Sequence, residues 1–236
     1  RDTIAQAQSG TGKTATFSIA ILQLIDPSKP VTQALVLEPT RELAEQSCQV
    51  LSDFSAPHMH DVFVKLLIGG RRTGLDIDGL RKGPQVVVGT PGRVMHMIQK
   101  GFLNLSQCRI CCLDEADEML SFGFKDQVYD IFQFLPSTSQ VALVSATMPP
   151  EVLELSQRFL RDPHRILLEK DEVKLDGIAQ FYVALESDDD KFATLCDIYS
   201  MLTINSSIIF CNTRRQVELL HAAMEKDGFS VSKIHG

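Results

Sequence analysis

Residues 7–14, AQSGTGKT, combine two glycines with a lysine and a threonine, the residue types that bind phosphate in a nucleotide-binding loop. Gly10 and Gly12 let the backbone curl so that its N–H groups point at a phosphate. Lys13 would reach the β- and γ-phosphates, and the Thr14 hydroxyl would ligate Mg²⁺. The general pattern begins with glycine, and Ala7 stands there instead, but the mechanism survives that change. The competing interpretation is a turn rich in Gly, Ser and Thr that contains an accidental lysine.

In a second stretch, ICCLDEADEML at residues 110–120, a short apolar run is followed by four carboxylates within five positions. Like charges this close repel, and a bound Mg²⁺ would offset them. Asp114 directly follows the run. In nucleotide hydrolases, the Asp that holds Mg²⁺ occupies the same position, at the end of a buried strand. Glu115 could orient the attacking water or accept its proton. We assign Asp117 to contacts with other motif residues, and Glu118 to a solvated first helical turn.

Short apolar runs alternate with helical periodicity over residues 1–168, and this order positions both stretches. Runs that are apolar on both faces suit a parallel sheet covered by helices on both sides. Helical stripes are expected at 43–54 and 124–135, and Pro149 and Pro150 suit the start of a helix that reaches about residue 160. The pattern predicts a doubly wound α/β domain. The expected strands are 34–37, 62–68, 85–88, 109–113, 141–144 and 165–168.

The charged segment EKDEVKLDG at residues 169–177 is interpreted as a linker, after which the alternation restarts. Residues 178–236 are therefore predicted to be a second, incomplete α/β domain. Its strands are expected at 180–185, 207–210 and 231–234, and its helices at 191–202 and 214–226.

Composition narrows the class of protein. A net charge of −7 argues against a generic basic coat for nucleic acid, although it allows a local basic patch. The chain shows no apolar stretch near the roughly 18–20 residues of a membrane helix, so no membrane partner is expected. Six cysteines are scattered along the chain, and the pair Cys108 and Cys111 lacks the further ligands of a zinc site. We predict buried reduced thiols and a cytoplasmic or nuclear protein.

The literal DEAD at residues 114–117, together with AQSGTGKT, resembles the DEAD-box RNA helicase family. Further family motifs follow in order: PTREL at 39–43, GG at 69–70, TPGR at 90–93, SAT at 145–147 and IIFCNT at 208–213. Within the family, DEADEML, GFKDQ, YDIFQ and ATMP are most similar to the translation initiation factor group of the four-A type, including its exon-junction relative. The resemblance extends over essentially the whole chain.

This resemblance implies RecA-like lobes that bind ATP and Mg²⁺ and lie on single-stranded or short duplex RNA. Lys13, Asp114 and Glu115 would be catalytic, and Thr14 and Asp114 would hold the metal. Asp117, Ser145 and Thr147 would couple hydrolysis to strand separation. The phosphate-binding residues would be Gly10, Thr11, Gly12, Lys13 and Thr14, and the RNA-binding residues would be Thr40, Arg41, Gly70, Thr90, Gly92 and Arg93.

The expected function is ATP-dependent local unwinding of RNA duplexes in translation initiation, by a monomer that scaffold proteins engage. One alternative is an ATP-gated RNA clamp within an mRNA–protein complex, and another is a truncated product without function. A DNA helicase is disfavoured by the combination of DEAD and TPGR. Family motifs upstream of residue 1 and beyond residue 236 are missing, so we expect this chain to be a piece of a longer protein and a weak ATPase by itself.

Two departures from the family pattern concern charge near the RNA path. Glu38 precedes PTREL where the family usually has alanine, and it would repel RNA unless it points away or pairs with a cation. Arg71 and Arg72 follow the glycine pair where close relatives carry uncharged residues. They would either compensate for Glu38 or be ordinary surface charge.

Overall fold

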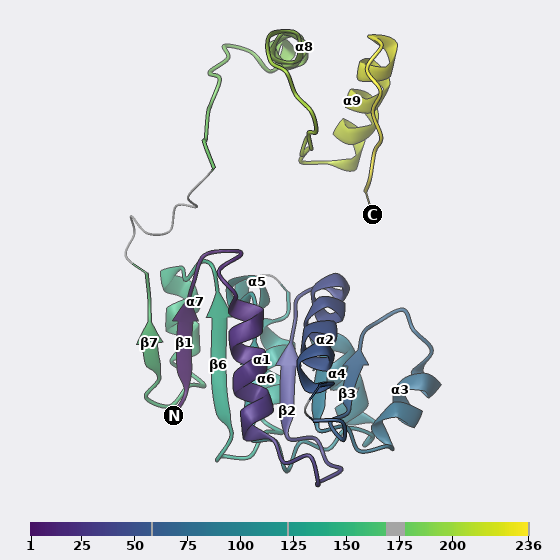
Figure 1. Ribbon diagram of the computed structural model, residues 1–236. Coiled ribbons are helices and arrows are strands. Elements are labelled where there is room, and N and C mark those ends of the chain that lie inside the picture. Colours follow the sequence, from purple (N-terminus) through teal and green to yellow (C-terminus); the bar gives the residue numbers. More distant parts are fainter. Residues whose placement is uncertain (58, 122, 169–177, 236) are drawn as a thin grey trace. The chain divides into compact units, whose positions relative to one another are not determined.

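A computed structural model describes residues 1–57, 59–121, 123–168 and 178–235 of the chain (Figure 1). The chain divides into two compact units, Arg1–Ile178 and Ala179–Gly236. The linker predicted at 169–177 lies outside the described residues. No helix in the described part of the chain is long and apolar enough to cross a membrane.

In the described residues of the first unit, seven strands form one sheet in the order β3-β4-β2-β5-β6-β1-β7. All its neighbouring strands run parallel, which confirms the predicted sheet. Every strand predicted in this unit is present, with ends shifted by at most two residues. The strands are β1 (Thr3–Gln6), β2 (Ala34–Leu37), β3 (Val64–Leu67), β4 (Val86–Gly89), β5 (Ile110–Leu113), β6 (Gln140–Ser145) and β7 (His164–Ile166).

Helices cover both faces of this sheet, as a doubly wound fold requires. On one face, α1 (Lys13–Leu24) and α2 (Arg41–Ser55) pack on Ala34 and Val36 of β2. On the other face, Leu35 and Leu37 of β2 join the core beneath the remaining helices. Figure 1 shows α1 and α2 in front of the sheet and α4 and α6 behind it. The helices on the second face include α3 (Thr73–Leu80), α4 (Pro91–Gln99), α5 (Ala116–Ser121), α6 (Lys125–Phe132) and α7 (Pro150–Ser156).

Two details of the helices differ from the prediction. The buried face of α2 consists of Ala44, Ser47, Leu51 and Ser55, whereas Phe54, which we expected in the stripe, is 42% exposed. The face is therefore turned by about one residue, because small side chains let α2 lie close to α1. Helix α7 begins at Pro150 but ends at Ser156, short of residue 160.

The cysteines are all free in the structure, and burial divides them into two groups. Cys108, Cys111 and Cys112 are buried, and burial raises the pKa of the Cys108 thiol to about 12. The other three cysteines are only half-buried, so the prediction of buried thiols is wrong for them.

The second unit contains the predicted helices but not the predicted sheet. It has a short 3₁₀ turn (Asp188–Asp190), α8 (Lys191–Met201) and α9 (Arg214–Lys226). The segments 180–185, 207–210 and 231–234 are not strands in the described residues, and Phe181, Phe210 and Ile234 are at least 90% exposed. The prediction of strands there is wrong. A strand needs a neighbour to accept and donate its backbone hydrogen bonds, whereas a helix satisfies its own.

Candidate functional site

The motif residues of the first unit gather where the parallel strands end. The loops that follow β1, β2, β4, β5 and β6 all leave the sheet at its carboxyl edge. This edge is where open α/β sheets bind ligands. Sequence motifs that lie far apart in the chain are therefore neighbours in space.

The glycine loop has the backbone that the sequence predicts. Gly10 and Gly12 have φ values of 78° and 93°, in the left-handed region that favours glycine. The Thr11 hydroxyl donates to the Gln8 carbonyl at 2.7 Å and holds the turn. Gly12 is the N-cap of α1, so the first N–H groups of the helix follow directly. A helix N-terminus behind a glycine turn is a favourable place for an anion.

Lys13 is the residue of this loop whose surroundings point most strongly to a bound anion. Its side chain is 9% exposed, and its Nζ makes no hydrogen bond within the described residues. The Glu115 carboxylate lies beside it, with Oε1 3.7 Å from Nζ. A buried ammonium group is unfavourable unless charged partners surround it. Phosphate oxygens would supply these partners. Thr14, the next residue in the chain, is half-buried.

Asp114 lies at the carboxyl end of β5 and is only 6% exposed. Burial raises its pKa to about 6, and the nearby Glu115 charge adds to this effect, whereas Lys13 opposes it. Asp114 Oδ1 accepts a hydrogen bond of 3.0 Å from the Glu115 N–H. A cation at Asp114 would relieve the repulsion between these carboxylates, so the donor set fits Mg²⁺.

Glu115 has a φ of 45°, which places a non-glycine residue in the left-handed region. Such a conformation is strained and persists only where the surrounding structure enforces it. The strand that ends at Leu113 and the helix that begins at Ala116 leave only two residues, Asp114 and Glu115, in which the chain must turn. The result is that the Glu115 carboxylate faces Lys13, across the glycine loop.

Asp117, Ser145 and Thr147 form one hydrogen-bonded cluster. Ser145 Oγ donates to Asp117 Oδ1 at 2.6 Å, and the Thr147 hydroxyl donates to Asp117 Oδ2. The Thr147 N–H also donates to Ser145 Oγ at 3.3 Å. The cluster ties the first turn of α5 to the end of β6. The sequence placed these three residues together, and their role in coupling stays a prediction.

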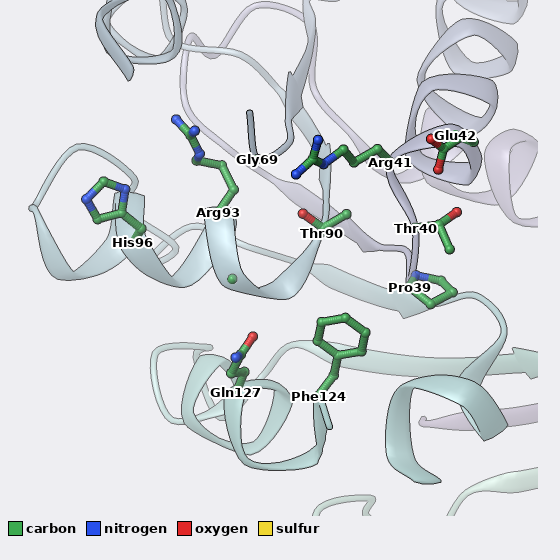
Figure 2. A pocket seen from close by; sticks show the side chains of 11 residues that line it. Pro39, Thr40, Arg41, Glu42, Gly69, Thr90, Arg93, His96, Phe124 and Gln127 are labelled. Carbon is green, nitrogen blue, oxygen red and sulfur yellow. The ribbon is translucent and has the colours of Figure 1, made fainter. Parts of the chain in front are cut away.

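Beside these motifs lies a pocket of about 700 Å³ (Figure 2). Most of the predicted RNA-binding residues line it: Thr40, Arg41, Thr90, Gly92 and Arg93. Gly70 does not line it, whereas Gly69 does. The Arg41 guanidinium lies against the glycine pair, because a Cβ on Gly70 would be only 2.8 Å from Arg41 Nη1. The lack of side chains at Gly69 and Gly70 therefore leaves room for the Arg41 guanidinium.

The two threonines of the pocket are held differently. Thr40 caps α2, and its hydroxyl accepts from the Leu43 N–H at 3.2 Å. Thr90 precedes α4, where its side chain makes no capping hydrogen bond and Pro91 fills the first turn. Both hydroxyls can still donate to an acceptor in the pocket.

Six lining residues were not predicted as site residues: Pro39, Glu42, Gly69, His96, Phe124 and Gln127. Gln127 Oε1 is buried and has no hydrogen-bond partner within the described residues. A Cβ on Gly92 would lie 3.5 Å from that oxygen. Figure 2 shows Phe124 and Gln127 on the side of the pocket opposite Arg41 and Arg93. The sequence signal was ambiguous, because Phe124 also fits the apolar stripe of α6.

Glu38 points away from this pocket. It is fully buried at the end of β2, and the Ser47 hydroxyl donates to its Oε1 at 2.5 Å. Burial raises its pKa to about 8, and the charge of Asp114 adds to this effect. Of the outcomes that the sequence allowed, the structure therefore shows the one in which Glu38 does not line the pocket that contains the predicted RNA-binding residues. Arg71 is ordinary surface charge, paired with Glu45 at 2.5 Å.

No group of three or more His, Cys, Asp or Glu side chains forms a metal cage within the residues that the structure describes. Mg²⁺ is usually held by one or two carboxylates, substrate phosphates and water, and the role of Asp114 as its ligand stays a prediction. The residues present fit a Mg²⁺–nucleotide pair better than an independent metal centre.

Comparison with known proteins shows to which family the chain belongs. The model of the DEAD/DEAH box helicase family matches residues 1–155. The whole chain is 55% identical to the ATP-dependent RNA helicase eIF4A of Mycosarcoma maydis and 54% identical to that of Schizosaccharomyces pombe. It spans 57% and 60% of the length of these two relatives. A structure of Saccharomyces cerevisiae Dbp5 bound to RNA and ADP BeF3 matches all of this chain and 59% of its own, with a TM-score of 0.85 and 34% identity.

Proposed function

The chain belongs to the DEAD/DEAH box helicase family, and on that premise we propose that it is part of an ATP-dependent RNA helicase of the eIF4A type. The observation that carries this proposal is the buried Lys13 amine, which makes no hydrogen bond within the described residues and lies 3.7 Å from Glu115 beside a glycine cradle. The relatives that are more than half identical are named ATP-dependent RNA helicases.

The residues at the sheet edge divide the work of ATP hydrolysis. The glycine loop and Lys13 would bind the phosphates, and Thr14 and Asp114 would hold the metal. Mg²⁺, when bound, neutralises charge on the phosphates. Glu115 orients the attacking water and accepts its proton. The Glu115 carboxylate is placed for this role beside the phosphate-binding lysine, with its Oε1 3.7 Å from Lys13 Nζ.

We propose that the adjoining pocket binds the sugar–phosphate backbone of RNA. Arg41 supplies a cation, and Thr40 and Thr90 supply hydroxyl donors. Gly92 leaves room for a close approach of the sugar–phosphate chain. Contacts of this kind give little sequence preference, so we propose that single-stranded or short duplex RNA binds regardless of sequence.

The cellular role proposed for the whole protein is local duplex unwinding during translation initiation. It would act in the cytoplasm as a monomer that scaffold proteins engage. Support comes from the identity to eIF4A relatives along the whole chain.

Dependence of hydrolysis on RNA tests the proposed function. Adding single-stranded oligouridine should raise the rate of ATP hydrolysis by this chain, and Arg41→Gln should reduce RNA affinity about tenfold and lower the slope of log affinity against log salt by roughly one. Hydrolysis is measured with and without RNA, and RNA affinity by fluorescence anisotropy at several salt concentrations. Arg81→Gln is the matched control, because Arg81 is 71% exposed and pairs with an exposed residue, Asp78. Equal hydrolysis rates with and without RNA, or equal affinities of Arg41→Gln and wild type, would overturn the proposal.

A further inference from the structure

Beyond the motifs, one buried acid connects three elements next to the pocket. Asp76 of α3 is 1% exposed. Its Oδ1 lies 3.2 Å from Lys65 Nζ on β3, and its Oδ2 lies 2.9 Å from Arg93 Nη1 on α4. The side chains of both cations are also largely buried, at 16% and 11% exposed. Two cations thus share one carboxylate under the surface that we propose for RNA.

Arg93 is held by more than this ion pair. Its Nη1 also donates to the Thr73 hydroxyl at 3.3 Å, and its Nη2 donates to the Arg71 carbonyl at 3.0 Å. These partners belong to the segment that follows the Gly69–Gly70 pair. Arg93 therefore links the start of α4 to the backbone that follows the two glycines. Its Nε makes no hydrogen bond within the described residues.

Stability alone does not account for this triad. Burying three charges carries a large desolvation penalty, and apolar side chains of similar volume would stabilise the fold equally well or better. The charges are useful only if Arg93 must remain an ion in a fixed position at the pocket. Arginine suits that task, because its planar group can bind several oxygens at once.

We propose that Asp76 is a positioning residue for RNA: it fixes the Arg93 guanidinium and, through the Arg71 carbonyl, the loop that carries Gly69 and Gly70. This inference rests on the proposed function, since it concerns the same RNA surface. It assigns Arg93 a different role from Arg41. Arg41 makes no ion pair with the carboxylates that the structure describes and contributes mainly charge. Arg93 is held by an ion pair with Asp76 and by hydrogen bonds to Thr73 and Arg71, and contributes mainly a fixed geometry.

The direction in which Asp76→Asn changes RNA affinity distinguishes a positioning role from simple electrostatics. Asp76→Asn removes a negative charge beside an RNA surface, so electrostatics alone would strengthen RNA binding. Positioning predicts the reverse, a loss of RNA affinity of about tenfold, within the range of couplings between contacting residues. The affinity is measured by anisotropy of fluorescent oligouridine with Mg²⁺, ADP and beryllium fluoride present. Mg-ATP binding by the same sample should be unchanged, since Asp76 lies outside the nucleotide site.

Asp78→Asn is the matched control, because Asp78 lies on the same helix, is exposed and pairs with an exposed residue, Arg81. It makes the same change of charge and should not weaken RNA binding. If Asp76 acts through Arg93, then adding Asp76→Asn to an Arg93→Gln variant should cause no further loss. If Asp76→Asn fails to fold, the double variant Lys65→Met, Asp76→Leu replaces the buried pair with apolar groups and should show the same loss of RNA affinity.

The possible outcomes separate this inference from the proposed function. Wild type that binds RNA, with Asp76→Asn or the apolar double variant binding as tightly or more tightly, would overturn the positioning role and leave the function standing. Full additivity of Asp76→Asn and Arg93→Gln would also overturn it. Wild type that fails to bind oligouridine would overturn both.

Discussion

Replacing Glu115 with glutamine should lower the rate of ATP hydrolysis by about 10²–10⁴-fold and leave Mg-ATP binding intact. Glutamine keeps the shape of the side chain but cannot accept a proton from water. Binding should be retained, because Lys13 and the glycine loop are untouched and one negative charge near the phosphates is removed. A single-turnover assay, with the chain in excess over radiolabelled ATP, measures even a slow rate.

The matched control for this variant is Glu118→Gln. Glu118 lies three residues further on and is exposed, and its replacement makes the same chemical change. Its hydrolysis rate should stay within about twofold of wild type, because surface substitutions have small effects. If Glu115→Gln hydrolyses ATP as fast as wild type, the group that accepts the proton lies elsewhere.

Replacing Glu38 with glutamine should stabilise the chain at alkaline pH, which is unusual for a buried position. Burial raises the pKa of Glu38 from 4.5 to about 8 in the folded protein. The folded state therefore binds more protons than the unfolded state between these two values. Its stabilising contribution is fully present below about pH 4.5 and is lost as pH rises through about 8.

Glutamine removes this pH dependence, because it is neutral at every pH and can still accept the hydrogen bond from Ser47. The free energy of unfolding of Glu38→Gln should exceed that of wild type by about 2–4 kcal/mol near pH 8.5, and the difference should shrink toward pH 5. Urea denaturation followed by circular dichroism measures it, without Mg²⁺ so that Asp114 stays free of metal.

The control for Glu38 is Glu42→Gln, on the exposed first turn of α2. It should change the free energy of unfolding by less than about 0.5 kcal/mol at either pH. A Glu38→Gln variant that is less stable than wild type near pH 8.5 would show that the buried side chain is ionised and stabilising there.

The sheet of the first unit was largely predictable, because its central strands are apolar on both faces and stand out in the sequence. Strand β1 was missed. Of its four residues only Ile4 is buried, so the segment carries almost no pattern of its own. Its place depends on partners far along the chain: Asp2 accepts from the Val141 and Arg161 N–H groups at 2.8 Å and 2.6 Å, beside β6 and β7.

The second unit shows the same distinction between local and non-local structure. Helix α9 was predicted with both of its ends, because its periodicity and its cap at Thr213 are local signals. The predicted strands had apolar sequences of the right kind, yet a strand also needs a neighbour of matching register. No local pattern can supply that.

The sequence predicted many of the residues that the structure brings together at the sheet edge, but less of their geometry. Topology brings the ends of parallel strands together, so motifs after different strands were expected to meet. The orientation of Glu38, the left-handed backbone of Glu115 and the triad around Asp76 depend on packing between elements. Nothing in a short stretch of sequence reports such contacts.

Binding of Mg-ATP by wild type and Lys13→Ala tests the central claim most directly, since both the nucleotide site and the proposed function depend on it. Lys29→Ala is the control, because Lys29 is 67% exposed and pairs with Asp26, three residues before it. Isothermal titration calorimetry should show Mg-ATP binding that Lys13→Ala weakens about 100-fold, as expected when a buried charged partner of the phosphates is removed. Lys29→Ala should bind like wild type. Equal affinity of Lys13→Ala and wild type would contradict the account, as would wild type that does not bind Mg-ATP.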